Sequence, residues 1–207
     1  MTRAPSLVVI AGPNGAGKST SAAALLRDAL SVKEFVNADV IASGLSGFRP
    51  EASAFAAGRV MLERLRELAG RRSDFAFETT LASRSLAPWL TELGATGYQV
   101  HVVFLWIPTA DLAVRRVRER VRSGGHDVPE DVIRRRFARG IRNFLTLYRP
   151  LAQSWRVYDN SRHSGPVQIA GGSGALVQRI RDEERWRAFE ASASPDEAAP
   201  DYRGDDA

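Results

Sequence analysis

Short apolar runs alternate with amphipathic stretches along most of the chain. The runs are rich in β-branched and aromatic residues and end in Gly, Pro or polar residues, as buried strands do. The run at 98–107 is apolar on both faces, which is typical of a central parallel strand. The pattern predicts strands at residues 6–11, 34–39, 74–78, 98–107 and 155–158, with 167–170 as a candidate sixth.

Helical spacing of apolar residues fills the intervals between these strands. In the stretch 51–69, apolar residues recur at three- and four-residue intervals, and Gly70 ends the pattern. The residues that define this stripe are Phe55, Met61, Leu62, Leu65 and Leu68. Thr109 is placed to cap the helix that follows the central strand. The other predicted helices span residues 18–30, 86–93, 110–122, 130–147 and 175–189.

Strands that alternate with helices predict an α/β fold, with about five parallel strands covered by helices on both faces. The chain shows no internal repeat, and we expect a single domain over residues 1–190. Residues 191–207 are acidic, contain prolines and have few large apolar side chains. That composition predicts a disordered tail.

Composition excludes several classes of function and leaves the predicted fold unchanged. The 207 residues suit one α/β domain, and 44% hydrophobic with 26% charged residues is ordinary for a globular protein. The absence of cysteine excludes disulfides, thiol nucleophiles and Cys-ligated zinc sites. The first six residues are too short and polar for a signal peptide, and the longest apolar run is half of a membrane span. We therefore expect a cytoplasmic protein with no membrane partner.

A phosphate-binding loop follows the first strand. Residues 12–19 read Gly-Pro-Asn-Gly-Ala-Gly-Lys-Ser, which matches the Walker A pattern between a strand and a helix. Backbone N–H groups of such a loop face phosphate oxygens, Lys18 would hold the β- and γ-phosphates, and Ser19 would ligate Mg²⁺. ATP and Mg²⁺ are therefore the expected cofactors. The predicted nucleotide-binding residues are Gly12, Pro13, Asn14, Gly15, Ala16, Gly17, Lys18, Ser19 and Thr20.

Motifs outside the phosphate loop distinguish the classes of P-loop protein from one another. ABC-type and AAA-type motors need an apolar strand that ends in adjacent acids, but the strand at 98–107 runs into Pro108 without one. An LSGGQ helix start and an Asn-Lys-x-Asp loop for guanine are also absent. The class that remains is the small-molecule kinase, in which the substrate and a lid complete the site.

Two acids are expected at the carboxyl ends of the strands, where ligands bind in open parallel sheets. Asp39 is the candidate catalytic base that orients the acceptor hydroxyl and takes its proton, and its alternative role is a helix N-cap. Glu78, with Thr80 and Arg84, forms a candidate substrate-binding cluster. Glu78 could instead coordinate Mg²⁺ through water, and the residues alone leave both roles open.

An arginine-rich segment is the candidate lid. Residues 111–149 contain 11 arginines against 5 acidic residues, and the predicted lid covers 115–140 as helix, Gly-Gly hinge and helix. Arg120 and Arg135 are the candidates to reach the γ-phosphate, although a solvated face explains most of these arginines. The segment lacks interleaved aromatics, which argues against a nucleic-acid partner. Asn160 and Ser161 could bond the adenine base, although a simple turn explains them equally well.

These motifs together resemble the zeta-toxin-like P-loop kinases. The resemblance covers roughly residues 7–161 and rests on the following segments: Gly-Pro-Asn-Gly-Ala-Gly-Lys-Ser-Thr at 12–20, Asn-Ala-Asp at 37–39, Phe-Ala-Phe-Glu-Thr-Thr at 75–80, Phe-Leu-Trp at 104–106, Arg-Glu-Arg-Val-Arg-Ser-Gly-Gly-His at 118–126 and Ile-Arg-Arg-Arg at 133–136. It implies a kinase fold with an adenylate-kinase-like parallel sheet. It also implies phosphorylation of a sugar hydroxyl of UDP-N-acetylglucosamine or another nucleotide sugar, and an antitoxin protein as a candidate partner.

The resemblance also implies residue roles. The family's general base falls on Asp39, its substrate-contacting Glu and Thr fall on Glu78 and Thr80, and one lid arginine falls on Arg120 within a residue. A second lid arginine has no clean counterpart: His126 lies near its place, and Arg134 and Arg135 are the candidates to replace it. The favoured hypothesis is a small-molecule phosphotransferase. The alternatives are an ATP-binding switch or ATPase without an acceptor, and a nucleic-acid-associated P-loop protein.

Overall fold

The computed structural model describes the chain except for residues 1–2, 28–31, 33, 46–53, 163 and 195–207. Within the described residues, seven strands form one sheet in the order β2-β3-β1-β4-β5-β6-β7. The strands are β1 (Ser6–Ala11), β2 (Glu34–Val36), β3 (Phe75–Thr79), β4 (Gln99–Trp106), β5 (Ser154–Asp159), β6 (Val167–Ser173) and β7 (Leu176–Ile180).

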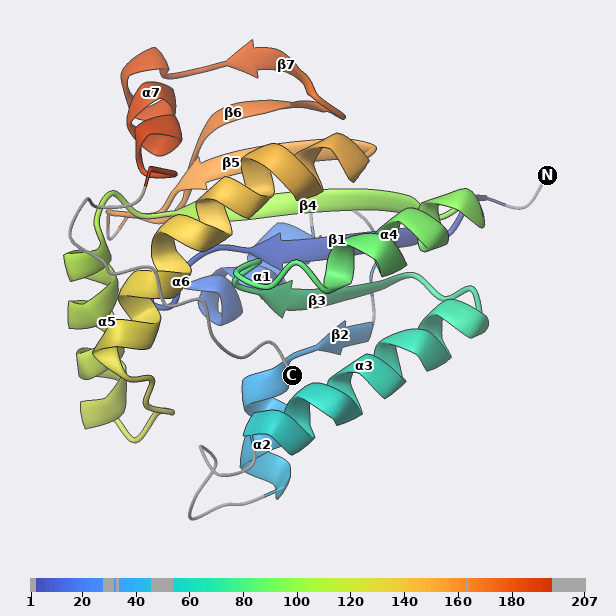
Figure 1. The fold of residues 1–207 in the computed structure, drawn as a ribbon, viewed down its shortest axis with the longest axis horizontal. Helices are drawn as coiled ribbons and strands as arrows, with labels where there is room; N and C mark the ends of the chain where they lie inside the picture. The colour runs from blue at the N-terminus through green and yellow to red at the C-terminus, as the bar shows by residue number, and fades with distance from the viewer. Residues whose placement is uncertain (1–2, 28–31, 33, 46–53, 163, 195–207) are drawn as a thin grey trace.

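The first five strands run parallel, and β1 lies between β3 and β4. The last residue of β1, Ala11, pairs with Thr79 on one side and Phe104 on the other. Because parallel strands all end at the same edge of a sheet, the segments after β1, β2, β3 and β4 lie together there (Figure 1).

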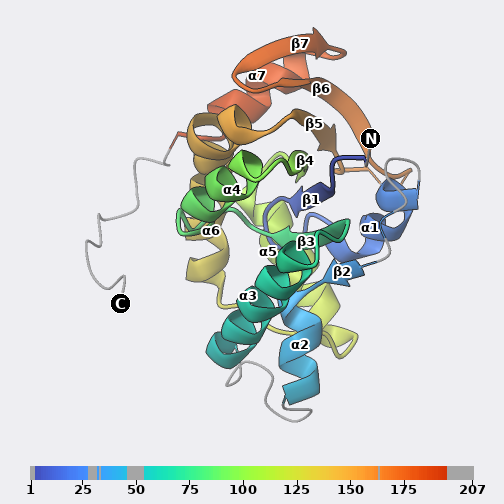
Figure 2. The same cartoon turned by 90° about the vertical axis from the view of Figure 1, so that its right-hand side faces the viewer.

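Helices cover both faces of this sheet. Figure 2 shows α3, α4 and α6 on one side and α1 on the other. The helices are α1 (Lys18–Arg27), α2 (Ala38–Leu45), α3 (Ala54–Gly70), α4 (Leu86–Ala95), α5 (Ala110–Arg122), α6 (Glu130–Asn143) and α7 (Glu183–Ala191). A π-helical turn at Phe144–Tyr148 and a 3-10 turn at Arg149–Leu151 continue α6. Thr109 Oγ1 accepts from the Leu112 N–H and caps α5, as predicted.

The core has two parts. Every residue of β1 is buried between the two helical layers. A second cluster of aromatic rings joins α6 to the last strands and α7, with the Trp155 ring stacked 5.9 Å from Trp186 and Phe104 packed 4.9 Å from Phe144. Phe189 of α7 lies within 6.0 Å of Trp106 and completes the cluster. The carboxyl-terminal elements are therefore packed onto the sheet by aromatic contacts.

The predicted α/β P-loop class is confirmed, but the sheet is larger than predicted and mixed. β5 pairs with β6, and β6 with β7, in antiparallel fashion. The predicted helix at 175–189 is wrong, because its first half is β7. Gly174, at φ +52°, turns the chain into a hairpin, and a new cap at Asp182 accepts from the Arg185 N–H at 3.0 Å to start α7.

Two further predictions are corrected in detail. The strand predicted at 34–39 ends at Val36, since α2 begins at Ala38. In α3 the inner stripe consists of Met61, Leu65 and Leu68, whereas Phe55 is 78% exposed. The start of the helix predicted at 51–69 and most of the predicted tail lie outside the described residues, so the division into a domain at 1–190 and a tail at 191–207 stays a prediction.

None of the described helices is long and apolar enough to cross a membrane.

The contact between α6 and the segment after β3 leads to a stability prediction. A Cβ added to Gly140 would lie 2.3 Å from the carbonyl oxygen of Thr80. Backbone on both sides must then move, so we expect Gly140→Ala to lower the free energy of unfolding by about 1–3 kcal/mol. Chemical denaturation of the variant and of the unmodified chain would measure this change in the free energy of unfolding.

Gly58→Ala in α3 is the matched control, because a Cβ at Gly58 meets no atom within 4 Å. Alanine there should stabilise the helix by roughly 0.5–1 kcal/mol. If both variants were equally stabilised, α6 would not be packed against Thr80 as described.

Candidate functional site

The loop between β1 and α1 is curled by three glycines. Gly12, Gly15 and Gly17 have φ values of +142°, +73° and +79°, which L side chains rarely adopt. At Gly12 a Cβ would lie 2.2 Å from the carbonyl oxygen of Leu105, so the loop passes directly over the end of β4. The curl leaves successive backbone N–H groups of the loop available to a phosphate chain.

Lys18 folds back into this loop. Its Nζ donates to the carbonyl oxygens of Gly12 at 2.9 Å and Pro13 at 3.0 Å. Burial lowers the pKa of Lys18, and the charges of Glu78 and Asp39 oppose that fall. The ammonium group is therefore held over the loop, between its carbonyl oxygens and two carboxylates.

Ser19 connects the loop to β3. Its Oγ donates to the carboxylate of Glu78, with oxygen distances of 2.9 and 3.1 Å, and accepts from Asn37 Nδ2 at 3.4 Å. Burial raises the pKa of Glu78, while the charge of Lys18 and the hydrogen bond from Ser19 lower it in part. The structure thus places Glu78 against the hydroxyl predicted to ligate Mg²⁺.

Asp39 lies in the first turn of α2, and it does not cap that helix. The cap is Asn37, whose Oδ1 accepts from the N–H groups of Asp39 at 2.7 Å and Val40 at 3.2 Å. The alternative role of Asp39 as N-cap is therefore wrong. Its carboxylate points across the site, where Oδ2 lies 3.9 Å from Arg120 Nη1.

Arg120 is held by the loop that joins α5 to α6. Its Nη2 donates to the carbonyl oxygen of His126 at 2.6 Å. A Cβ on Gly125 would lie 2.5 Å from Arg120 Cγ, so only glycine lets the loop close around this side chain. Gly124 and Gly125, predicted as a hinge, here let the loop backbone pass close to the Arg120 side chain.

The arginines of α6 have different surroundings. Arg134 ion-pairs with Asp111 of α5 at 2.7 Å and with Glu130 at 2.8 Å, which joins the two helices. Partial burial lowers the pKa of Arg136, Arg135 adds to the fall, and the charge of Asp39 opposes it. The charge of Arg136 also lowers the pKa of Lys18, so Arg136 is the α6 arginine whose field reaches the site.

The sequence analysis selected Arg135 and not Arg136, although the helical period of the apolar residues in α6 distinguishes the two positions. Ile133, Phe137 and Ile141 are buried and define the packed face of α6. At 100° per residue, Arg135 lies on the opposite side of the helix, whereas Arg136 flanks the packed face. Arg135 and Arg136 are both exposed, and the predicted role of Arg135 stays a prediction.

The segment after β3 holds the other predicted substrate residues. Thr80 Oγ1 accepts from the Ala82 N–H at 3.4 Å, and Leu81 has φ +55°, a strained value for a bulky side chain. Asn143 of α6 donates to the carbonyl oxygens of Leu81 at 2.8 Å and Ala82 at 3.1 Å and so fixes this turn. Arg84 follows the turn and is exposed.

Two residues that sequence reasoning did not assign to the loop hold it in place. Asn160 Nδ2 donates to the carbonyl oxygen of Ala16 at 2.8 Å, so its amide, proposed for the adenine base, is bonded to the loop instead. Arg116 donates to the carbonyl oxygens of Asn160 at 2.8 Å, Ser161 at 3.0 Å and Gly15 at 3.4 Å. Together they attach the loop to α5 and to the end of β5.

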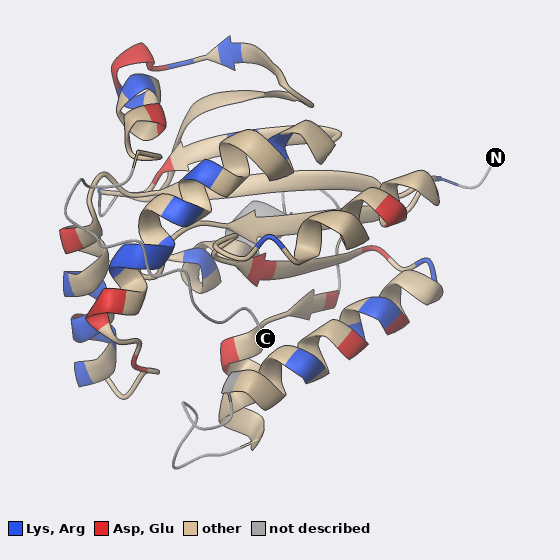
Figure 3. Cartoon of the chain, viewed as in Figure 1, with Lys and Arg blue, Asp and Glu red and all other residues tan. Residues whose placement is uncertain are grey.

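These residues fit a nucleotide with Mg²⁺. Among the described residues no group of three or more His, Asp or Glu forms a metal site by itself. A P-loop does not require one, because phosphate oxygens and a single hydroxyl supply most ligands of the ion. Figure 3 shows basic positions along α5 and α6 and acidic positions at the end of β3 and the start of α2.

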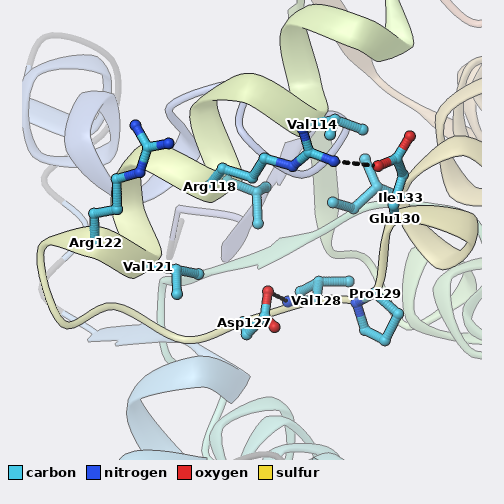
Figure 4. Close-up of a pocket in the computed structure, with 10 residues that line it drawn as sticks. Val114, Arg118, Val121, Arg122, Asp127, Val128, Pro129, Glu130 and Ile133 are labelled. Carbon is cyan, nitrogen blue, oxygen red and sulfur yellow. Dashed lines mark hydrogen bonds and ion pairs between the residues drawn. The ribbon is translucent and has the colours of Figure 1, made fainter.

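A separate cavity of about 360 Å³ lies between α5, α6 and the loop that joins them (Figure 4). Val117, Val128 and Ile133 form its apolar floor, and Arg118 and Glu130 pair across its rim at 2.6 Å. No residue of the phosphate loop lines it, so the nucleotide site is distinct from this cavity.

The sequence profile of the family described as "AAA domain" matches residues 7–146, more than half of the chain. An uncharacterized protein of Haemophilus influenzae is 28% identical over 126 residues, which covers 61% of this chain and 88% of that protein.

Solved structures share the fold at low sequence identity. AvrRxo1-ORF1:-ORF2 with ATP matches with a TM-score of 0.68 and 18% identity, covering 97% of this chain and 66% of that chain. This chain thus spans less than two thirds of that relative. The PezAT chromosomal toxin-antitoxin system of Streptococcus pneumoniae matches with a TM-score of 0.59 and 17% identity over 92% of this chain and 86% of that one. A putative kinase of Chloroflexus aurantiacus matches with a TM-score of 0.51 and 15% identity over 62% and 74%.

The contact between Asn160 and the loop predicts an effect on nucleotide affinity. Removing the amide in Asn160→Ala leaves the Ala16 carbonyl without its buried partner, so the loop loses a restraint. We expect ATP to bind about tenfold more weakly, as measured with a fluorescent ATP analogue.

Ser161→Ala is the control, because Arg116 contacts only the backbone carbonyl at that position. Its affinity should stay within about twofold of the unmodified chain. An equal loss in both variants would point to direct contact with the base rather than support of the loop.

Proposed function

This chain belongs to the AAA domain family, and we propose that it is an ATP-dependent phosphotransferase. It would transfer the γ-phosphate of ATP to a hydroxyl group of a small metabolite. The observation that carries the proposal is the convergence of Lys18 and Ser19 with the carboxylates of Asp39 and Glu78 at one edge of the sheet. Asp39 is bonded neither to the loop nor to Ser19, which leaves its carboxylate available to an acceptor hydroxyl.

In the proposed reaction the acceptor oxygen attacks the γ-phosphorus, and the bond from the γ-phosphorus to the β,γ-bridging oxygen breaks. The Asp39 carboxylate takes the proton of the acceptor hydroxyl, and ADP leaves. Asp39 suits this role because Asn37 has taken over the helix cap and leaves the carboxylate free to face the site. Lys18 and the loop N–H groups hold the phosphate chain in line.

Two arginines offset the charge that develops on the γ-phosphate oxygens. Arg120 reaches Asp39 from α5, and Arg136 acts on both Asp39 and Lys18 from α6. Mg²⁺, when bound, would neutralise charge on the β- and γ-phosphate oxygens, with Ser19 as its protein ligand. Glu78, bonded to the Ser19 hydroxyl, would orient that hydroxyl and the water around it.

For the acceptor we propose a nucleotide sugar such as UDP-N-acetylglucosamine. The support is the resemblance to zeta toxins together with the shared fold of PezAT, a toxin-antitoxin system. Thr80 and Arg84 follow Glu78 on the segment held by Asn143, where they would contact the acceptor. The same likeness supports an antitoxin protein as a partner of this chain.

Label transfer from γ-labelled ATP, with Mg²⁺, to a panel of UDP-sugars and other hydroxyl metabolites tests the reaction. We expect a labelled metabolite with the unmodified chain. Lys18→Ala and Asp39→Asn should each lower the transfer rate by about 10²-fold or more, since one holds the phosphates and the other takes the proton. Asp39→Asn should leave ATP affinity within about threefold, because Asp39 does not contact the loop.

Labelled inorganic phosphate as the sole product, at a rate that Asp39→Asn leaves unchanged, would contradict the proposal and indicate an ATPase or switch.

The neighbouring arginines of α6 provide a matched pair. Arg136→Gln should lower kcat by about 10³-fold because it removes a charge that acts on the transferred phosphate. Arg135→Gln removes the same charge one residue away, on the side of the helix opposite its packed face, and should change kcat by less than about threefold. Steady-state kinetics on both variants measures the difference. The reverse order would assign the catalytic role to Arg135.

A further inference from the structure

A basic hollow lies on the outer part of the sheet, away from the phosphate loop. It has a volume of about 440 Å³, within the range of small-molecule sites. Its polar lining comes from three strands and includes Arg156, Gln168, Gln178, Arg179 and Arg181. β5, β6 and β7 form the edge of the sheet farthest from β2 (Figure 1).

The strand register forms the hollow. Gly171 of β6 pairs with Arg156 of β5 on one side and Arg179 of β7 on the other. Directly paired residues of antiparallel strands point to the same face, so the two arginines flank a position without a side chain. A Cβ on Gly171 would lie 3.1 Å from Gln168 Nε2 and 3.7 Å from Arg156 Cγ. Gly171 is therefore the floor of the hollow, and a larger residue would fill it.

The face that carries the hollow is not the one that packs on the aromatic core. Trp155 points to Phe144 of the π-helical turn and to Trp186 of α7, and Arg156 is the next residue on the same strand, so it points to the other face. The hollow begins at Ser154, the first residue of β5, whereas Asp159 and Asn160 at the other end lie next to the phosphate loop. Arg156, the last lining residue of β5, is three residues before Asp159, a separation of ~10 Å along the strand.

The charge in the hollow is uncompensated within the described part of the chain, where no carboxylate lies within 4.0 Å of Arg156, Arg179 or Arg181. The nearby acids Asp159, Asp182 and Glu183 pair instead with arginines of α7. Burial and the charge of Arg156 lower the pKa of His101 on β4, so the positive field extends to the neighbouring strand. His101 is held there by Ser154, with 2.8 Å between Nδ1 and Oγ.

We propose that this hollow binds the phosphate group of a small phosphorylated molecule, separately from the nucleotide site. Arginine forks offer paired N–H donors that match phosphate oxygens, and two of them face each other across a glycine floor. The glutamines supply neutral donors and acceptors for the rest of the ligand. The inference does not rest on the proposed transfer reaction, because no residue is shared between the two sites.

Amide NMR on the full chain, titrated with inorganic pyrophosphate, tests the proposal. The backbone signals of Gly171 and Gly172 should shift in a saturable way, apart from any shifts of the phosphate-loop glycines. Arg156→Gln and Arg179→Gln should each weaken binding at these signals by about tenfold or more. Gly171→Ala, which fills the hollow without changing charge, should also weaken it. Thermal unfolding of each variant would show that it is folded.

Arg187→Gln is the charge-matched control, since Arg187 is an exposed residue of α7 paired with Glu183 at 2.8 Å. It should leave binding unchanged, and an equal loss there would overturn the proposal in favour of general charge attraction. Retained binding in Gly171→Ala, or no shift of Gly171 and Gly172 at millimolar pyrophosphate, would also overturn it.

A single-stranded RNA oligomer is the second ligand of the experiment. If it bound the same glycines more than a hundredfold more tightly than pyrophosphate, with a steep salt dependence, the occupant would be nucleic acid. That outcome would overturn the small-molecule proposal. Comparable or weaker binding of RNA supports it.

Discussion

The close passage of the phosphate loop over β4 is the constraint on which the rest of the site depends. At Gly12 the loop lies so near the Leu105 carbonyl that no side chain fits between them. This contact fixes where the curl begins, and therefore where Lys18 and Ser19 stand relative to β3. Arg116 and Asn160 hold the far side of the same loop, so it is restrained from the sheet below and from the end of β5. A loop fixed in this way needs little reorganisation when a phosphate chain binds.

The site also depends on a balance of buried charge. Burial lowers the pKa of Lys18, and the charges of Glu78 and Asp39 oppose that fall, while burial raises the pKa of Glu78 itself. Arg120 and Arg136 add positive charge from α5 and α6. An excess of cations over carboxylates at the mouth of the loop favours a polyanion such as a nucleotide phosphate chain.

The second half of α6 is fixed to the segment that follows β3. Gly140 packs directly on Thr80, and Asn143 bonds the turn that follows it, just before the helix widens into a π-helical turn. The end of α6 is thus fixed to the proposed acceptor-binding segment. Its start is joined to α5 by the pairs of Arg134 with Asp111 and of Arg118 with Glu130, so the two helices of the predicted lid at 115–140 are linked to each other.

Sequence alone determined the features that depend on local physics. The phosphate loop, the cap at Thr109 and the alternation that places Glu78 at a strand end follow from turn chemistry and periodicity. The tertiary structure decided what depends on partners far apart in the chain. Asn37 rather than Asp39 caps α2, and the packing of Ile133, Phe137 and Ile141 decides which arginines of α6 flank its buried face. Likewise, Leu176–Ile180 form a strand because β6 offers a free edge for hydrogen bonds. Local sequence propensity cannot predict such contacts, because each one joins elements that only the complete fold brings together.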